Sequence, residues 1–113
     1  METVQVSRKN GVCIFKYSGE LTLEVVDRLK EEIGSYLQNQ DCDSVVMDLS
    51  GVSFLDSSGI GFLVHLNNQR KEQGKGFYIY NPSSQVRKTL SLVRLLDYFQ
   101  VLEQEKDLDK LAQ

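Results

Sequence analysis

The chain has 113 residues, of which 41% are hydrophobic and 26% are charged, and its 13 basic and 16 acidic side chains give a net charge of −3. These proportions are typical of one globular domain and exclude a disordered, collagen-like or coiled-coil chain. The longest uninterrupted apolar runs have four residues, as in 12–15, which is too short for a membrane span or a signal-peptide core. We therefore expect a single cytoplasmic domain over residues 1–113 that makes no membrane contact.

The charges are unevenly distributed along the chain. Residues 57–96 carry six basic side chains and one acidic side chain, whereas residues 1–56 and 97–113 are both acidic. Six cations over forty residues form no dense basic cluster, so we interpret them as a solvated face, with an acidic partner or a phosphate as the alternative. With a pI near 5.1, the chain is not expected to bind nucleic acid.

The two cysteines, Cys13 and Cys42, lie 29 residues apart without a Cys-x-x-Cys pair, and His65 is the only histidine. This set is too small for a four-ligand zinc site and does not resemble a disulfide framework. We expect reduced cysteines, a cytosolic setting, and neither a metal ion nor a cofactor.

The chain opens with two strands and a helix. Residues 3–7 alternate between polar and apolar, and residues 12–17 form an apolar run. Asn10-Gly11 between them is typical of a tight hairpin, so the first two strands should be antiparallel. From Thr22 the apolar period becomes helical and predicts an amphipathic helix capped by that residue. Its inward side chains should be Val26, Leu29, Ile33 and Leu37.

The rest of the chain alternates between strands and helices. Residues 44–49 are apolar and rich in β-branched side chains, which is typical of a strand covered on both faces. After it we expect a helix over 58–73, a strand over 77–80, a helix from Ser83 or Ser84, a short strand over 99–102, and an end helix around Leu108 and Leu111. The inward side chains of the two middle helices should be Ile60, Phe62, Leu63, Val64, Leu66, Val86, Leu90 and Val93.

This order predicts the α/β fold class. The second, third and fourth strands should be parallel, because a helix crosses between each pair. The expected architecture is an N-terminal antiparallel hairpin joined to a mostly parallel sheet of four or five strands with crossover helices. The loops at 19–22, 50–57 and 81–84 should then open on one edge of the sheet, where open α/β sheets bind their ligands.

The most distinctive segment runs from the end of the third strand into the second helix. Asp56, Ser57 and Ser58 lie at the expected helix start, where unpaired N–H groups and a partial positive charge favour caps and also a bound or covalent phosphate. Gly59 and Gly61 follow in the first turn. Each glycine lowers the stability of the helix by about 1 kcal/mol relative to alanine. We therefore expect these two positions to require a residue without a side chain, either because a partner approaches the backbone there or because the helix packs closely on the sheet.

Residues 49–61 read Leu-Ser-Gly-Val-Ser-Phe-Leu-Asp-Ser-Ser-Gly-Ile-Gly. This run resembles the signature of the STAS family (sulfate transporter and anti-sigma factor antagonist) in its stand-alone bacterial form. Residues 19–21 and 81–90 also match, so the resemblance covers nearly the whole chain. Two positions depart from the pattern: Thr22 stands where an acidic residue is frequent, and Leu95 where a glycine is usual near the end of the third helix.

The resemblance implies an anti-sigma factor antagonist, a binding protein and not an enzyme, that is switched by phosphorylation. In similar proteins the serine directly after the motif's aspartate, here Ser57, accepts the phosphoryl group. The anti-sigma factor is the serine kinase, and a PP2C-type phosphatase reverses the mark. The unphosphorylated antagonist binds the anti-sigma factor and releases a sigma factor, and the phosphorylated one dissociates.

The neighbours of Ser57 have roles that the sequence leaves open. Ser58 either caps the helix or supports the phosphoacceptor, and Asp56 either orients the Ser57 hydroxyl or holds the loop. Ile60, Gly61 and Val64 either contact the partner or belong to the core. The partner-binding switch loop is expected to comprise Asp56, Ser58, Gly59, Ile60 and Gly61.

Two other functions compete with this interpretation. A serine hydrolase is disfavoured, because the chain lacks Gly-x-Ser-x-Gly and His65 lies on the same expected helix as the serines. Neither nucleotide-binding glycine motif is present. The alternative with the same fold is a STAS scaffold or cytoplasmic subunit of a lipid or anion transport complex that is never phosphorylated, and the identity of the bound partner would discriminate between the two.

Overall fold

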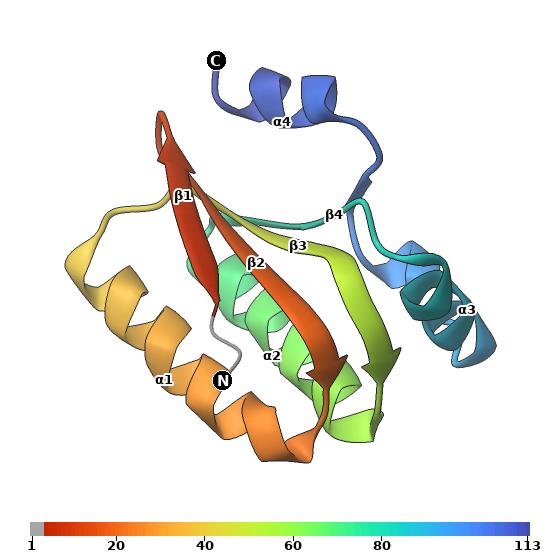
Figure 1. The fold of residues 1–113 in the computed structure, drawn as a ribbon. Helices are drawn as coiled ribbons and strands as arrows, with labels where there is room; N and C mark the ends of the chain where they lie inside the picture. The colour runs from red at the N-terminus through yellow and green to blue at the C-terminus, as the bar shows by residue number, and fades with distance from the viewer. Residues whose placement is uncertain (1–3) are drawn as a thin grey trace.

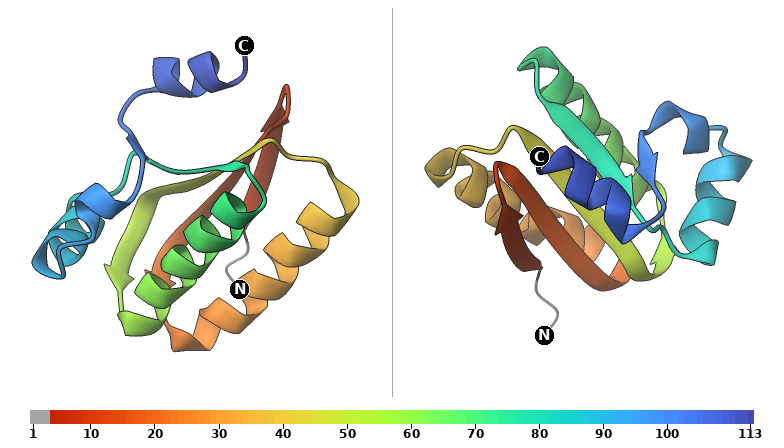
Figure 2. Two further views of the ribbon diagram at one scale, coloured as in Figure 1. Left: turned by 180° about the vertical axis from the view of Figure 1, so that it is seen from behind. Right: turned by 90° about the horizontal axis from the view of Figure 1, so that it is seen from above.

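The structure, a computed structural model, describes residues 4–113 and contains one sheet with helices on both faces (Figures 1 and 2). The strands are β1 (Gln5–Lys9), β2 (Val12–Leu21), β3 (Ser44–Leu55), β4 (Gly76–Tyr80) and β5 (Val101–Leu102). The helices are α1 (Leu23–Asn39), α2 (Ser57–Glu72), α3 (Ser84–Leu92), a 3-10 turn (Leu96–Tyr98) and α4 (Glu105–Leu111).

The sheet has the strand order β1-β2-β3-β4-β5. β1 pairs antiparallel with β2, and β3, β4 and β5 follow in parallel. At the hairpin, Asn10 and Gly11 have φ values of 48° and 82°, the left-handed values that a two-residue turn requires. The predicted fold class and hairpin are confirmed, although residue 3 of the expected first strand lies outside the described residues.

Helices α1 and α2 lie side by side on one face of the sheet, as the left view of Figure 2 shows. Alternate residues of the central strands point into this layer, because side chains of a strand alternate between its two faces. They include Phe15, Tyr17, Met47, Leu49, Phe77 and Ile79. On the other face, Leu108 and Leu111 of α4 pack against a smaller cluster that contains Val12 and Val46.

Most of the side chains predicted to face inward are buried. Those of α1, α2 and α3 are Val26, Leu29, Ile33, Phe62, Leu63, Leu66, Val86 and Leu90, with Leu37, Ile60 and Val64 half-buried. Val93 is 48% exposed, so its prediction was wrong. The reason is that α3 ends at Leu92 and the chain turns at Arg94, whose φ is 59°, so the helical period no longer holds. The position that favours glycine is therefore Arg94 and not Leu95.

Strand β3 is longer than predicted, because it continues through residues 50–55, which we expected to be a loop. Ser50 and Gly51 are weak strand formers, but β2 pairs with this segment up to Leu21 opposite Leu55, after register shifts within residues 16–20. The extension reduces the connection between β3 and α2 to the single residue Asp56.

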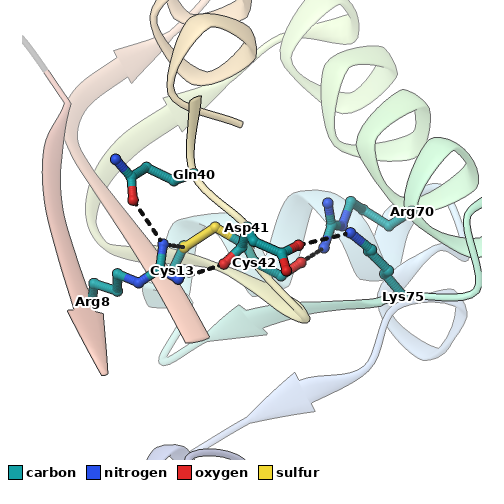
Figure 3. The surroundings of a disulfide bond; sticks show 7 residues. All are labelled: Arg8, Cys13, Gln40, Asp41, Cys42, Arg70 and Lys75. Atoms are coloured by element: carbon teal, nitrogen blue, oxygen red, sulfur yellow. Dashed lines mark hydrogen bonds and ion pairs between the residues drawn. A yellow bond between two sulfur atoms is a disulfide. The ribbon is translucent and has the colours of Figure 1, made fainter. Parts of the chain in front are cut away.

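Cys13 and Cys42 form a disulfide, with their Cα atoms 5.8 Å apart (Figure 3). The expectation of two reduced cysteines was therefore wrong. β2 and β3 are neighbouring parallel strands, so the residues before β3 lie beside the start of β2 whatever the length of the crossover between them. The cysteines thus give no support for a cytosolic setting.

Candidate functional site

The candidate site lies where β2 and β3 end and where α1 and α2 begin next to each other, at the bottom of Figure 1. Asp56 is the N-cap of α2, and its Oδ1 accepts a hydrogen bond from the N–H of Gly59 at 2.9 Å. Its Oδ2 accepts from the N–H of Leu23, the first residue of α1, at 3.1 Å. One carboxylate therefore joins the N-termini of two helices, and both helix dipoles favour its negative charge.

Thr22 is the N-cap of α1, but its side chain makes no capping hydrogen bond within the described chain. The prediction that Thr22 is the capping residue of this helix is confirmed, but its carbonyl, and not its hydroxyl, accepts the hydrogen bonds, and the carboxylate of Asp56 binds the N–H of Leu23. Of the two roles left open for Asp56, the geometry supports holding the loop.

Ser57 is the first residue of α2 and is exposed, while Ser58 is half-buried. The N–H of Gly59 is bound by the Asp56 carboxylate, and that of Ile60 by the Asp56 carbonyl at 3.0 Å. Within residues 4–113 this leaves the N–H groups of Ser57 and Ser58 without an acceptor, as expected for the first positions of a helix. The Ser57 hydroxyl thus stands in solvent beside two available donors at the positive end of α2.

Gly59 and Gly61 lack side chains for different reasons. A Cβ on Gly59 would lie 2.4 Å from the backbone carbonyl oxygen of Leu21, so α2 packs against the end of β2 only with glycine there. A Cβ on Gly61 would meet nothing within 4 Å, and the residue is exposed. Packing explains Gly59, whereas Gly61 leaves bare backbone on the outer surface.

Two exposed apolar side chains near this site were missed by the sequence reasoning. Leu23 is 65% exposed at the start of α1, and Phe54 is 45% exposed two residues before Asp56. The helical period gave no signal for Leu23, because this residue lies three positions before the buried Val26, a spacing that predicts the same face. Such side chains on a rim are candidates for contact with another protein.

The arrangement places an exposed hydroxyl next to an exposed apolar rim. His65 is exposed and lies eight residues after Ser57, about 12 Å along α2, too far to act as its base. Residues 4–113 contain no group of three or more His, Cys, Asp or Glu side chains placed to hold a metal ion. No helix in this part of the chain is both long and apolar enough to span a membrane.

The third loop lies apart from this site. Ser83, the N-cap of α3, donates its hydroxyl to the carbonyl of Val52 at 2.6 Å and accepts from the N–H of Val86. The prediction that three loops share one edge therefore holds for the first two only, because β4 ends opposite Asp48 and leaves the last part of β3 without that neighbour.

Comparison with known proteins adds to this geometry. The anti-sigma-F factor antagonist RsfB of Mycobacterium tuberculosis is 31% identical over 93 residues, which are 82% of this chain and 75% of RsfB. The unphosphorylated anti-sigma factor antagonist SpoIIAA superposes with a TM-score of 0.79 at 20% identity over 96% of both chains. Phosphorylated SpoIIAA of Bacillus gives 0.73 at 19% identity, over 96% of this chain and 99% of that one.

Part of a transporter has the same fold. The murine anion transporter Slc26a9 superposes with a TM-score of 0.79 at 22% identity, over 95% of this chain but 18% of the transporter. The family model of the STAS domain matches residues 3–108. This match covers nearly the whole sequence, and the chain therefore belongs to the STAS domain family.

Proposed function

We propose that this protein is an anti-sigma factor antagonist whose binding to an anti-sigma factor is switched by phosphorylation of Ser57. The observation that supports this proposal most directly is that Ser57 is exposed and occupies the first position of α2. The names of the relatives support the general function, and SpoIIAA has been solved in both phosphorylation states.

In the unphosphorylated state, the anti-sigma factor docks on the surface around Ser57 and releases its sigma factor. The contact surface comprises the expected switch loop, of which Gly61 is bare and exposed, together with the apolar side chain of Leu23. Apart from Asp56, whose two carboxylate oxygens already accept hydrogen bonds from Gly59 and Leu23, these groups add no charge that docking would have to desolvate. Because a sigma factor acts on transcription, these proposed partners support a cytoplasmic location, which the cysteines do not.

Phosphorylation changes the charge of this surface. The anti-sigma factor, acting as a serine kinase, transfers the γ-phosphoryl group of ATP to Oγ of Ser57, with loss of the hydroxyl proton and release of ADP. A PP2C-type phosphatase hydrolyses the phosphoester and regenerates the hydroxyl. The protein is thus the substrate of both enzymes.

The phosphoryl group adds about −1.5 to −2 charges. In the free domain, the N–H groups of Ser57 and Ser58 and the helix dipole stabilise it, while the carboxylate of Asp56 opposes it. In a docked interface, a dianion desolvated without a cationic partner costs several kcal/mol, and about 1.4 kcal/mol is tenfold in affinity. The mark therefore lowers affinity by about two decades or more with little change of fold.

The test compares wild type, Ser57→Ala and Ser57→Asp by calorimetric titration with the anti-sigma factor that co-purifies with the protein. We expect Ser57→Ala to stay bound in the presence of ATP and Ser57→Asp to bind at least tenfold more weakly. Both should melt within a few degrees of wild type, because residue 57 is exposed. Ser58→Ala is the matched control and should retain ATP-dependent release.

Three outcomes would overturn the proposal. Equal affinity of wild type, Ser57→Ala and Ser57→Asp for the anti-sigma factor would contradict the charge mechanism. A phosphopeptide phosphorylated on Ser58 would show that Ser58, and not Ser57, is the phosphorylation site. Co-purification with a transport ATPase, without any anti-sigma factor, would instead assign the protein to a transport complex.

A further inference from the structure

A groove of about 430 Å³ lies at the opposite end of α1 and α2 from Ser57. The last turns of both helices, the loop before β3 and the segment that leads into β4 form its walls. Its polar lining includes Gln38, Asp41, Gln69, Arg70, Gln73 and Lys75.

Arg70 is unusual among these residues because it is only 4% exposed. Its guanidinium donates to the carbonyl oxygen of Cys42 at 2.5 Å, a neutral acceptor. Within residues 4–113, its Nε has no hydrogen-bond partner and no carboxylate forms an ion pair with it. Buried arginines are normally paired with an anion. The structure thus leaves a desolvated positive charge at the wall of the groove, and one of its donors, the covered Nε, has no partner.

Desolvation lowers the pKa of Arg70, and the carboxylates of Asp43 and Asp41 only partly counter this effect from a longer range. The C-terminal ends of helix dipoles favour basic side chains, and α2 carries Arg70 and Lys71 in its last turn, whereas α1 carries none. They do not explain why Arg70 is buried, because a surface cation interacts with a helix C-terminus without losing its hydration.

Lys75 supplies a second cation to the groove. Its Nζ lies 3.3 Å from Oδ1 of Asp41, and the Asp41 side chain is 86% exposed. An exposed ion pair of this kind is weak, so an incoming anion competes with Asp41 for Lys75 at little cost. Figure 3 shows the head groups of Arg70 and Lys75 next to each other, both directed toward the loop that carries Asp41 and Cys42.

We propose that this groove binds a small organic anion, with its carboxylate or phosphate group between Arg70 and Lys75. The amides of Gln69 and Gln73 are additional donors, and Leu37 provides an apolar wall for the carbon skeleton. This site is independent of the proposed phosphorylation switch. Ser57 and Arg70 are thirteen residues apart on α2, about 20 Å, so anion and anti-sigma factor can be bound together.

The test is a titration of the full chain followed by amide chemical shifts, with sodium citrate in one arm and sodium phosphate in the other. Sodium chloride at matched ionic strength is the reference. We expect saturable shifts at residues 41–43 and 69–76 in at least one arm. Saturation by citrate alone identifies a carboxylate ligand, and saturation by phosphate alone a phosphate ligand.

Matched variants separate the groove from general surface charge. Arg70 holds the loop before β3, so the test uses Lys75→Gln, which should weaken the binding at least fivefold and keep the fold. Lys71→Gln is the control, because Nζ of Lys71 lies over the ring of Tyr98, away from the groove, at 5.9 Å from its centroid. Chemical shifts that match those seen with chloride would overturn the proposal, as would equal losses of affinity in Lys75→Gln and Lys71→Gln. Ser57→Ala should bind the anion like wild type.

Discussion

Asp56 shows how a single residue connects the fold to the site. Its two oxygens bind the N–H groups of Gly59 and Leu23, so the surface that carries Ser57 is fixed relative to α1. A lost N-cap costs about 1 kcal/mol. A cap from one of residues 56–58 was expected at the start of α2, and the structure identifies it as Asp56. The bond to Leu23 was not expected, because 33 residues separate the partners.

The two glycines of the switch loop should respond to alanine in opposite directions. Gly59→Ala should lower the free energy of unfolding by about 1–3 kcal/mol, because its Cβ would overlap the Leu21 carbonyl. Gly61→Ala should raise that free energy by up to about 1 kcal/mol through helix propensity. Urea denaturation measures both changes.

Binding gives Gly61 a second test. If a partner approaches its bare backbone, Gly61→Ala should weaken binding of the anti-sigma factor while the domain becomes more stable. Unchanged affinity would remove Gly61 from the docking surface, and wild-type stability of Gly59→Ala would contradict the packing explanation.

At the scale of the elements, α2 and α3 end in the same hydrogen-bonded turn. In both, the two N–H groups that follow the helix cap donate to carbonyls three and five residues earlier. The turning residue is Gly74 after α2, with a φ of 69°, and Arg94 after α3, with a φ of 59°. Only the second turn places a side chain in the left-handed region, which costs a non-glycine residue about 1 kcal/mol.

Arg94→Gly should therefore raise the free energy of unfolding by about 0.5–1 kcal/mol, because glycine adopts the turn without steric cost. Gly74→Ala is the matched opposite and should lower it by a similar amount. Both positions are exposed, so few other contacts change. Thermal unfolding of the two variants beside wild type measures the effect, and a destabilised Arg94→Gly would show that the arginine side chain makes a stabilising contact.

For the whole molecule, the order of strands and helices is visible in the sequence because the apolar period changes from two to 3.6 at their boundaries. That order was enough to predict the sheet and the rim that carries Ser57. Contacts between distant segments were not predictable in this way. The Cys13–Cys42 bond depends on the pairing of β2 with β3. The burial of Arg70 depends on how α2 packs on the sheet, and a helical period marks Arg70 only as a polar residue.

The disulfide affects the stability of the whole domain. Cys13 and Cys42 are 29 residues apart and enclose α1, so the bond lowers the entropy of the unfolded chain, an effect of about 3–4 kcal/mol. Reduction should lower the melting temperature by on the order of 10 °C, as measured with and without dithiothreitol. The C13A/C42A variant is the control and should not respond to the reductant. Mass spectrometry confirms that the wild-type disulfide is fully reduced. If the melting temperature of this reduced protein equals that of the oxidised protein, the disulfide contributes nothing to stability and the prediction is contradicted.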